Sequence, residues 1–172
     1  MRLLLTVAST LLFLVSTTFG FVDFSGRWVL DLRASSSPDA MLQRLGASWV
    51  ERRLGGSLQM EANYTQTPQS LTVDRQGLGF QKTDVIRTDN IPETEEDSLL
   101  GRYTIRTHWS ESGTQLISDI SFRTKDSRDA QMTVVRELAD GGKTLVWRSM
   151  LKIAGESRNW ELRRVWRKPG SP

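Results

Sequence analysis

The chain has 172 residues, a formal net charge of +3 and no cysteine. This length fits one domain with a sizeable hydrophobic core, and the absence of cysteine excludes a small scaffold held together by disulfides. The net charge is too small to indicate nucleic acid as a partner. Acidic residues are also interspersed among the basic ones, so the basic residues do not form a continuous run.

Residues 1–20 have the layout of a secretory signal peptide. Arg2 gives a basic start, residues 3–15 are almost all apolar, and small residues lead to a predicted cleavage site after Gly20. The apolar run is shorter than the roughly 20 residues that a membrane-spanning helix needs. We therefore expect residues 21–172 to form one secreted domain, which would be extracellular, or periplasmic in a bacterium.

Residues 35–56 have helical spacing. The serines and Pro38 suit a helix start, Gly46 interrupts the apolar pattern, and a pair of glycines ends it. One apolar face precedes Gly46 and a second follows it, formed by Met41, Leu42, Leu45, Trp49, Val50 and Leu54. The segment predicts two short helices joined at Gly46.

Almost all of the remaining chain alternates apolar and polar residues, which is typical of strands with one buried face. The predicted strands cover residues 24–32, 58–64, 70–79, 80–87, 99–109, 116–122, 132–138, 145–153 and 160–168. The acidic segment 89–97 has low hydrophobicity and is expected to be an extended surface loop. The fold predicted is mainly β: an up-and-down antiparallel β-barrel of about ten strands, closed and with a two-helix lid after the first strand.

Two arginines interrupt the apolar faces of predicted strands: Arg136 in residues 132–138 and Arg164 in residues 160–168. An unpaired buried guanidinium is costly, so each arginine needs a negative partner. That partner is either the anionic head group of a ligand inside the barrel or a buried Asp or Glu. A β-bulge that shifts the alternation would also remove the problem, and the pattern alone leaves these alternatives open.

Five segments, in chain order, resemble the fatty-acid-binding proteins, also called intracellular lipid-binding proteins. They are DFSGRWVLDL (23–32), PDAMLQRLGASWVERRLGG (38–56), FQKTDVIR (80–87), VVRELADGGKTLVW (134–147) and LRRVWRK (162–168). The family begins with a Phe-x-Gly-x-Trp strand, carries a helix-turn-helix lid, contains a Val-Arg-Glu-Leu stretch and finishes on an Arg-x-Tyr strand. The related lipocalins share the first-strand motif but usually place a helix after the barrel, so the order of elements favours the fatty-acid-binding family.

The resemblance implies a ligand site. It places Arg136 and Arg164 at the family's carboxylate-anchoring positions and Trp166 where the family has tyrosine. An indole N–H donates one hydrogen bond but lacks the hydroxyl, so the head group could differ from that of a simple fatty acid. The other residues expected to line or gate the cavity are Met41, Leu45, Trp49, Trp147, Trp160 and Leu162.

These patterns predict a non-enzymatic secreted carrier for a fatty acid or similar hydrophobic anion, with transient membrane contact through residues 38–56 and no nucleic-acid partner. No cofactor and no metal are expected, because the single histidine, His108, lies on a polar face and no metal-ligand spacing occurs. The alternative is a lipocalin-like barrel with a filled interior, acting as an extracellular or envelope interaction module. In that case internal acids would pair with the two arginines.

Overall fold

Alternation along the chain produces ten strands. They are β1 (Gly26–Leu30), β2 (Met60–Gln66), β3 (Ser70–Gly77), β4 (Phe80–Arg87), β5 (Glu93–Asp97), β6 (Gly101–Trp109), β7 (Gln115–Arg123), β8 (Asp129–Ala139), β9 (Thr144–Ile153) and β10 (Trp160–Arg167). A short 3₁₀ turn, η1 (Asp140–Gly142), joins β8 to β9. The computed structural model describes residues 20–170, so the predicted signal peptide lies outside the described residues except for Gly20.

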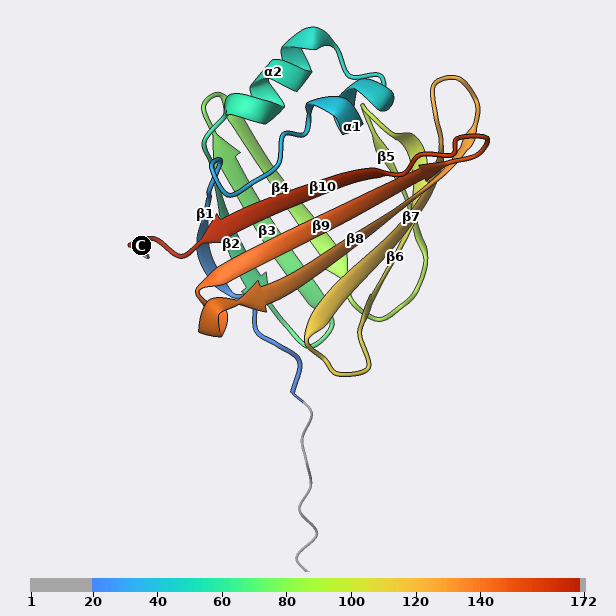
Figure 1. Cartoon of the computed structure of the whole chain (residues 1–172). Coiled ribbons are helices and arrows are strands. Elements are labelled where there is room, and N and C mark those ends of the chain that lie inside the picture. Colours follow the sequence, from blue (N-terminus) through green and yellow to red (C-terminus); the bar gives the residue numbers. More distant parts are fainter. Residues whose placement is uncertain (1–19, 171–172) are drawn as a thin grey trace, which may run out of the picture.

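The strands form one antiparallel sheet in the order β4-β3-β2-β1-β10-β9-β8-β7-β6-β5, which curls into a barrel (Figure 1). The predicted fold class is confirmed. Complete closure is not, because the edge strands β4 and β5 share no hydrogen-bonded ladder. Two ion pairs bridge these edges instead: Lys82–Asp97 at 3.9 Å and Arg87–Glu93 at 3.4 Å.

The prediction that residues 89–97 form a surface loop is wrong for most of their length. Glu93–Asp97 is strand β5, which pairs with β6 along its whole length. Backbone hydrogen bonds to β6 hold this strand, and three of its four carboxylates, those of Glu93, Glu95 and Asp97, have cationic or hydroxyl partners. The low hydrophobicity of the segment suggested a loop, but hydrophobicity gives no information about backbone hydrogen bonds to a neighbouring strand.

Two helices, α1 (Asp39–Arg44) and α2 (Trp49–Ser57), follow β1 and lie over one end of the barrel (Figure 1). They are joined at Gly46, as the sequence predicts. Gly46 has a φ of +80°, and a Cβ at this position would lie 2.9 Å from the Lys125 side chain. Lys125 Nζ donates a hydrogen bond of 2.8 Å to the Gly46 carbonyl, so the joint between the helices is fixed to the β7–β8 turn.

Two apolar clusters hold the barrel together. One contains β1, β2 and β3 residues together with Leu116, Leu145 and Trp166, around the fully buried Trp28. The other joins Met41 and Leu45 of the lid to the inner faces of β7, β8 and β9. Members of both clusters reach the space inside the barrel, where the candidate site lies.

Candidate functional site

A cavity of about 600 Å³ occupies the interior of the barrel beneath the lid. Its volume lies within the range of small-molecule sites in proteins, roughly 300–1,000 Å³. The wall combines apolar side chains from the lid and the sheet with arginines, acids and tyrosine. The interior is therefore not filled by the protein's own side chains, which argues against the interaction-module alternative.

Arg136, Trp147 and Arg164 form a row across three neighbouring strands. In the ladder registers, Trp147 of β9 lies opposite Arg136 of β8 on one side and opposite Arg164 of β10 on the other. All three residues line the cavity. The two predicted arginines therefore face inward, one on each side of the same indole.

Arg136 is nearly inaccessible to solvent, with 8% of its surface exposed. One terminal nitrogen, Nη1, donates a 3.0 Å hydrogen bond to Ser118, and the guanidinium carbon lies 5.1 Å from the centre of the Trp147 ring. Its Nε has no hydrogen-bond partner among the described residues. Burial lowers the pKa of the guanidinium, as expected for a charge taken out of water.

Arg164 is equally buried, with 7% exposed, but it points to the lid. Its one hydrogen bond within the described chain runs from Nη2 to the carbonyl of Gly55, in the last turn of α2, at 3.4 Å. A cation is favourable there because the carbonyls at a helix C-terminus carry partial negative charge. Arg164 thus connects the cavity wall to the lid, and burial lowers its pKa too.

Neither arginine makes an ion pair with a carboxylate of the described residues. This separates two alternatives that the sequence leaves open. Within the described residues no carboxylate lies at ion-pair distance from either guanidinium, and both side chains face the cavity. The site is therefore electropositive on this wall.

Trp147 and Trp166 add two hydrogen-bond donors to the same wall. Their ring centres are 5.3 Å apart and both residues line the cavity. Trp166 is 1% exposed. Neither indole Nε1 has a hydrogen-bond partner among the described residues, and both nitrogen atoms are buried.

The lid residues divide. Met41 and Leu45 are buried and line the cavity, as predicted. Trp49 does not line it: at the start of α2 its side chain is turned outward and 66% exposed. Trp49, which the sequence predicts to line or gate the cavity, lies outside the lining because the apolar face of α2 is not the face that meets the barrel; Val50 and Leu54 of this face are exposed as well.

The two remaining predicted residues lie on β10. Leu162 lines the cavity. Trp160, at the start of the strand, does not: its Nε1 donates a 3.0 Å hydrogen bond to Glu156, and Arg158 lies over its ring. The alternation therefore assigns Trp160 to the correct face of the strand but does not show where along the strand the cavity ends.

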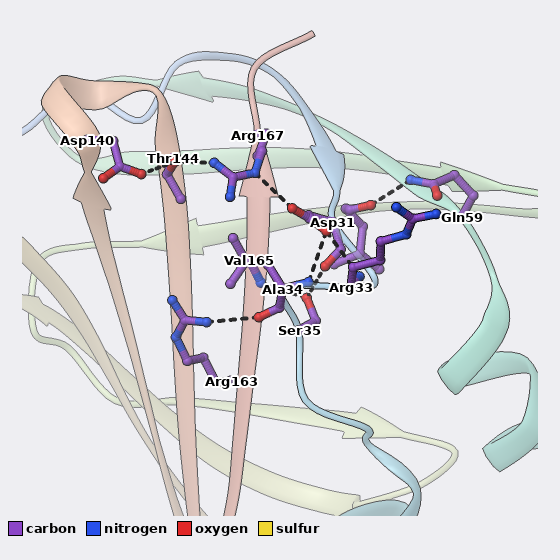
Figure 2. A network of polar contacts seen from close by, with 11 residues as sticks. Asp31, Arg33, Ala34, Ser35, Gln59, Asp140, Thr144, Arg163, Val165 and Arg167 are labelled. Carbon is purple, nitrogen blue, oxygen red and sulfur yellow. Dashed lines mark hydrogen bonds and ion pairs between the residues drawn. The ribbon is translucent and has the colours of Figure 1, made fainter. Parts of the chain in front are cut away.

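Side chains on the outer face of β10 hydrogen-bond to the segment between β1 and α1. Arg163 donates to the carbonyl of Ala34 at 2.9 Å, and Arg167 donates to the carboxylate of Asp31 at 2.8 Å (Figure 2). These bonds fix the segment between β1 and α1 across the strand. Because successive side chains of a strand point to opposite faces, Arg164 faces inward where its neighbour Arg163 faces outward.

Sequence reasoning missed three polar residues of the interior: Tyr64, Arg75 and Asp84. Arg75 and Asp84 line the cavity and form an ion pair with each other. The signal was present, because Arg75 has the same parity as the buried Leu71 and Val73 of its strand. Applying to β3 the argument made for β8 and β10 would have found it.

Lining charges on the β4–β5 side all have partners. Asp84 is paired with Arg75 and Lys82; burial alone would raise the pKa of its carboxyl, but these two cations outweigh burial and lower it. Glu95 accepts a hydrogen bond from the Tyr103 hydroxyl. The ion pairs that bridge β4 and β5 account for the other lining charges of these two strands.

The described residues show neither a metal-ligand cluster nor a membrane span. No group of three or more His, Cys, Asp or Glu side chains among residues 20–170 could hold a metal ion. In the same part of the chain, no helix has the length and apolar character needed to cross a bilayer. His108 lies half-buried on β6, with its Nδ1 3.9 Å from the carboxylate of Asp119.

No protein-family model and no curated protein matches this sequence. Solved structures do match. The chain is similar to apo lipid-binding protein 8 of Caenorhabditis elegans, with a TM-score of 0.64 and 14% identity over 90% of this chain and 99% of that chain. It is similar to human cRBP IV, with a TM-score of 0.64 and 15% identity over 86% of this chain and 98% of that chain.

A third similar structure is the Schistosoma mansoni fatty-acid-binding protein in complex with arachidonic acid. Its TM-score is 0.61 and its identity 18%, over 84% of this chain and 95% of that chain. At these identities the likeness establishes the fold. The protein therefore has the fold of the fatty-acid-binding and lipid-binding proteins, with the lid, the barrel and the order of elements in common.

Proposed function

We propose that this protein is a non-enzymatic carrier that binds a fatty acid, or a similar hydrophobic anion, inside its barrel. The observation that carries the proposal is the pair of buried guanidinium groups of Arg136 and Arg164. Both lie on the cavity wall with less than a tenth of their surface exposed, and neither has a carboxylate partner in the described chain.

The electrostatics of the wall favour an anionic head group. Burying a charge without a partner is costly, and a ligand carboxylate would offset that cost with charge-assisted hydrogen bonds. Arg136 offers its unpartnered Nε, and Trp147 and Trp166 offer indole N–H groups. Arg164 would leave the carbonyl of Gly55, which holds it at 3.4 Å, to join the head group.

The apolar part of the wall favours a hydrocarbon tail. Met41 and Leu45 of the lid, with Ile120, Val134 and Leu162 of the sheet, surround the space beneath the helices. Each methylene group transferred from water to such surroundings contributes about 0.8 kcal/mol. The similar structures support this ligand class, since one is named for its complex with arachidonic acid and another as a lipid-binding protein.

The test is a comparison of two arginine variants by titration with a fluorescent fatty-acid analogue and displacement with oleate. Arg164→Leu should weaken binding by about tenfold or more, because hydrogen bonds to charged groups contribute roughly 1.5–3 kcal/mol. Arg106→Leu, on the exposed outer face of β6, is the matched control and should bind normally. Unchanged affinity in a well-folded Arg164→Leu protein would refute the anchor.

Native mass spectrometry of the purified protein, followed by extraction, tests the carrier itself. A co-purifying fatty acid or related amphiphile is the expected result. A protein that carries no lipid and also ignores the fluorescent analogue would contradict the proposal.

We also propose transient contact between the lid and an anionic bilayer during delivery. The outward face of α2 exposes Trp49, Val50 and Leu54 beside Arg53. Apolar and basic side chains in this arrangement suit the surface of an anionic membrane. Transfer of a bound fluorescent fatty acid to vesicles should be faster with anionic than with neutral lipid, and Trp49→Ser should reduce that difference; equal rates would exclude the contact.

Secretion completes the proposal. It rests on the layout of residues 1–20 in the sequence. Sequencing of the N-terminus of the exported protein should begin at Phe21. A protein retained in the cell with Met1 in place would contradict it.

A further inference from the structure

The cavity wall carries a second group of charged residues, on the side where the edge strands β4 and β5 face each other. These lining residues are four acids and three cations: Asp84, Glu93, Glu95, Asp97, Arg75, Lys82 and Arg87. Ion pairs neutralise every one of them except Glu95. In the described chain Glu95 makes no ion pair, and its carboxylate accepts one side-chain hydrogen bond, from the neutral hydroxyl of Tyr103.

Glu95 faces the cavity and has unused hydrogen-bond acceptor positions. It lies opposite Tyr103 in the β5–β6 ladder, and both residues line the cavity. Burial raises the pKa of the Tyr103 phenol and the hydrogen bond to Glu95 raises it further, so the phenol stays protonated and continues to donate. A carboxylate has about four acceptor positions, of which Tyr103 occupies one. Because Glu95 is exposed, the others are open to a group that enters the cavity.

The ladder registers place Glu95 and Arg136 at opposite ends of the wall. Tyr103, the partner of Glu95, lies opposite Phe122 of β7, whereas Arg136 lies opposite Leu116 of the same strand. These two positions on β7 are six residues apart, which corresponds to roughly 20 Å of strand. Between them, the residues of β7 and β8 that line the cavity are all apolar: Ile120, Met132 and Val134.

A plain hydrocarbon tail suits the middle of this path but not its far end. The last methylene groups of such a tail would displace water from the Glu95 carboxylate and offer no hydrogen bond in return, which is unfavourable for a charged group. A hydroxyl at that place would donate to the carboxylate, and such charge-assisted hydrogen bonds are roughly twice as strong as neutral ones. The wall therefore suits a ligand that is anionic at one end, apolar in the middle and a hydrogen-bond donor at the other end.

We propose that the ligand is a fatty acid with a hydroxyl group near the far end of its tail, and that Glu95 accepts a hydrogen bond from this hydroxyl. The inference rests on the proposed carrier function and deepens it, because it narrows the class of ligand. Palmitate and ω-hydroxypalmitate differ only in the terminal hydroxyl, so the ratio of their affinities isolates its contribution. In a cavity without an acceptor at that place, the hydroxyl would weaken binding.

The experiment measures the affinities of the purified protein for both acids, by displacement of a fluorescent fatty-acid analogue. The parent should bind ω-hydroxypalmitate at least as tightly as palmitate. Glu95→Met should lower the affinity for ω-hydroxypalmitate relative to palmitate by about tenfold or more, because a hydrogen bond to a charged group is lost. Glu95→Gln, which keeps a neutral acceptor, should lower this ratio by about threefold.

The neighbouring acid on the same strand provides the matched control. Glu96 is exposed and does not line the cavity, because successive side chains of a strand point to opposite faces. Glu96→Met makes the same chemical change on the outer face and should leave the ratio of the two affinities unchanged. The melting temperature of each variant shows whether it is folded, and the nearly isosteric Glu95→Gln keeps the test available if Glu95→Met does not fold.

Three results would overturn the inference while leaving the carrier function intact. One is a parent protein that binds palmitate about tenfold or more tightly than ω-hydroxypalmitate. Another is a ratio that stays unchanged in folded Glu95 variants, including an equal loss for both acids, which would assign Glu95 a structural role. The third is the same change of ratio in Glu96→Met, which would assign the effect to the charge of β5 in general. If the parent binds neither acid, the carrier function fails first and the inference falls with it.

Discussion

The two walls of the cavity differ in whether their charged side chains are paired with a counter-charge. On the β8–β10 wall, Arg136 and Arg164 are buried and have no carboxylate partner in the described chain. On the β3–β5 wall, the charges are paired: Arg75 with Asp84, and Lys82 with Asp97 across the gap between the sheet edges. The Lys82–Asp97 pair joins two edge strands that no backbone ladder connects.

This difference separates structural charge from functional charge. A charge that is paired with a counter-charge inside the protein contributes to the stability of the folded state and needs no ligand to neutralise it. A buried charge without a counter-charge destabilises the ligand-free protein and is neutralised when an anion enters. Buried guanidinium groups without a counter-charge therefore locate the expected head group on the β8–β10 wall, and the paired wall is expected to contact the rest of the ligand.

The largest effect is expected on the unpaired wall. Arg136→Met should weaken oleate binding by about 10- to 100-fold, because it removes a charge and its hydrogen bonds. The same change should raise the free energy of unfolding of the ligand-free protein by about 1 kcal/mol, since a flexible apolar side chain replaces a guanidinium without a counter-charge. Titration and urea unfolding of one preparation measure both quantities. A variant that loses stability along with affinity would show that Arg136 is structural.

A smaller effect of opposite kind is expected on the paired wall. Asp84→Asn should lower the free energy of unfolding by about 1 kcal/mol, because it leaves Arg75 without its counter-charge in a partly exposed pair. Oleate affinity should change less than about twofold, since the wall does not hold the head group. Asp129→Asn, from the exposed pair with Arg123, is the control and should be nearly neutral in urea unfolding. A large loss of affinity in Asp84→Asn would break the distinction between the walls.

The smallest effect concerns pH and the attachment of the lid. Glu156 accepts hydrogen bonds from Trp160 and from Arg44 of α1, and these lower the pKa of its carboxyl. Its contribution to stability is therefore present above the usual glutamate pKa of about 4.3, and is lost as the pH falls through the lowered value. Glu156→Gln should melt below the parent at neutral pH, and the two melting temperatures should converge in acid. Parallel curves at all pH values would show that the charge of Glu156 contributes nothing.

The paired wall also shows where sequence reasoning stopped short. The alternation that placed Arg136 and Arg164 inside was applied to β8 and β10 but not to β3, where Arg75 follows the same rule. The sequence pattern does not predict strand β5, because nothing in the acidic segment 89–97 distinguishes a strand paired to β6 from a loop. Pairing between strands is a property of two segments, and composition describes one.

The adjacent residues Arg163 and Arg164 separate what was determined at each level. Local alternation determined that one arginine faces outward and the other inward, because side chains in a strand alternate between its two faces. Local sequence patterns likewise determined nine of the ten strands, the two helices joined at Gly46 and the apolar character of the interior. These features depend on residues that are close together in the sequence, so they can be predicted without knowing the tertiary structure.

Only the tertiary structure decided which charges are satisfied. Arg163 finds the carbonyl of Ala34, and Arg164 finds only a carbonyl of the lid. Trp49 turns to solvent. Each outcome depends on segments far apart in the chain that are brought together when the sheet curls, and the position of an unpaired buried charge is fixed only when every possible partner has its place.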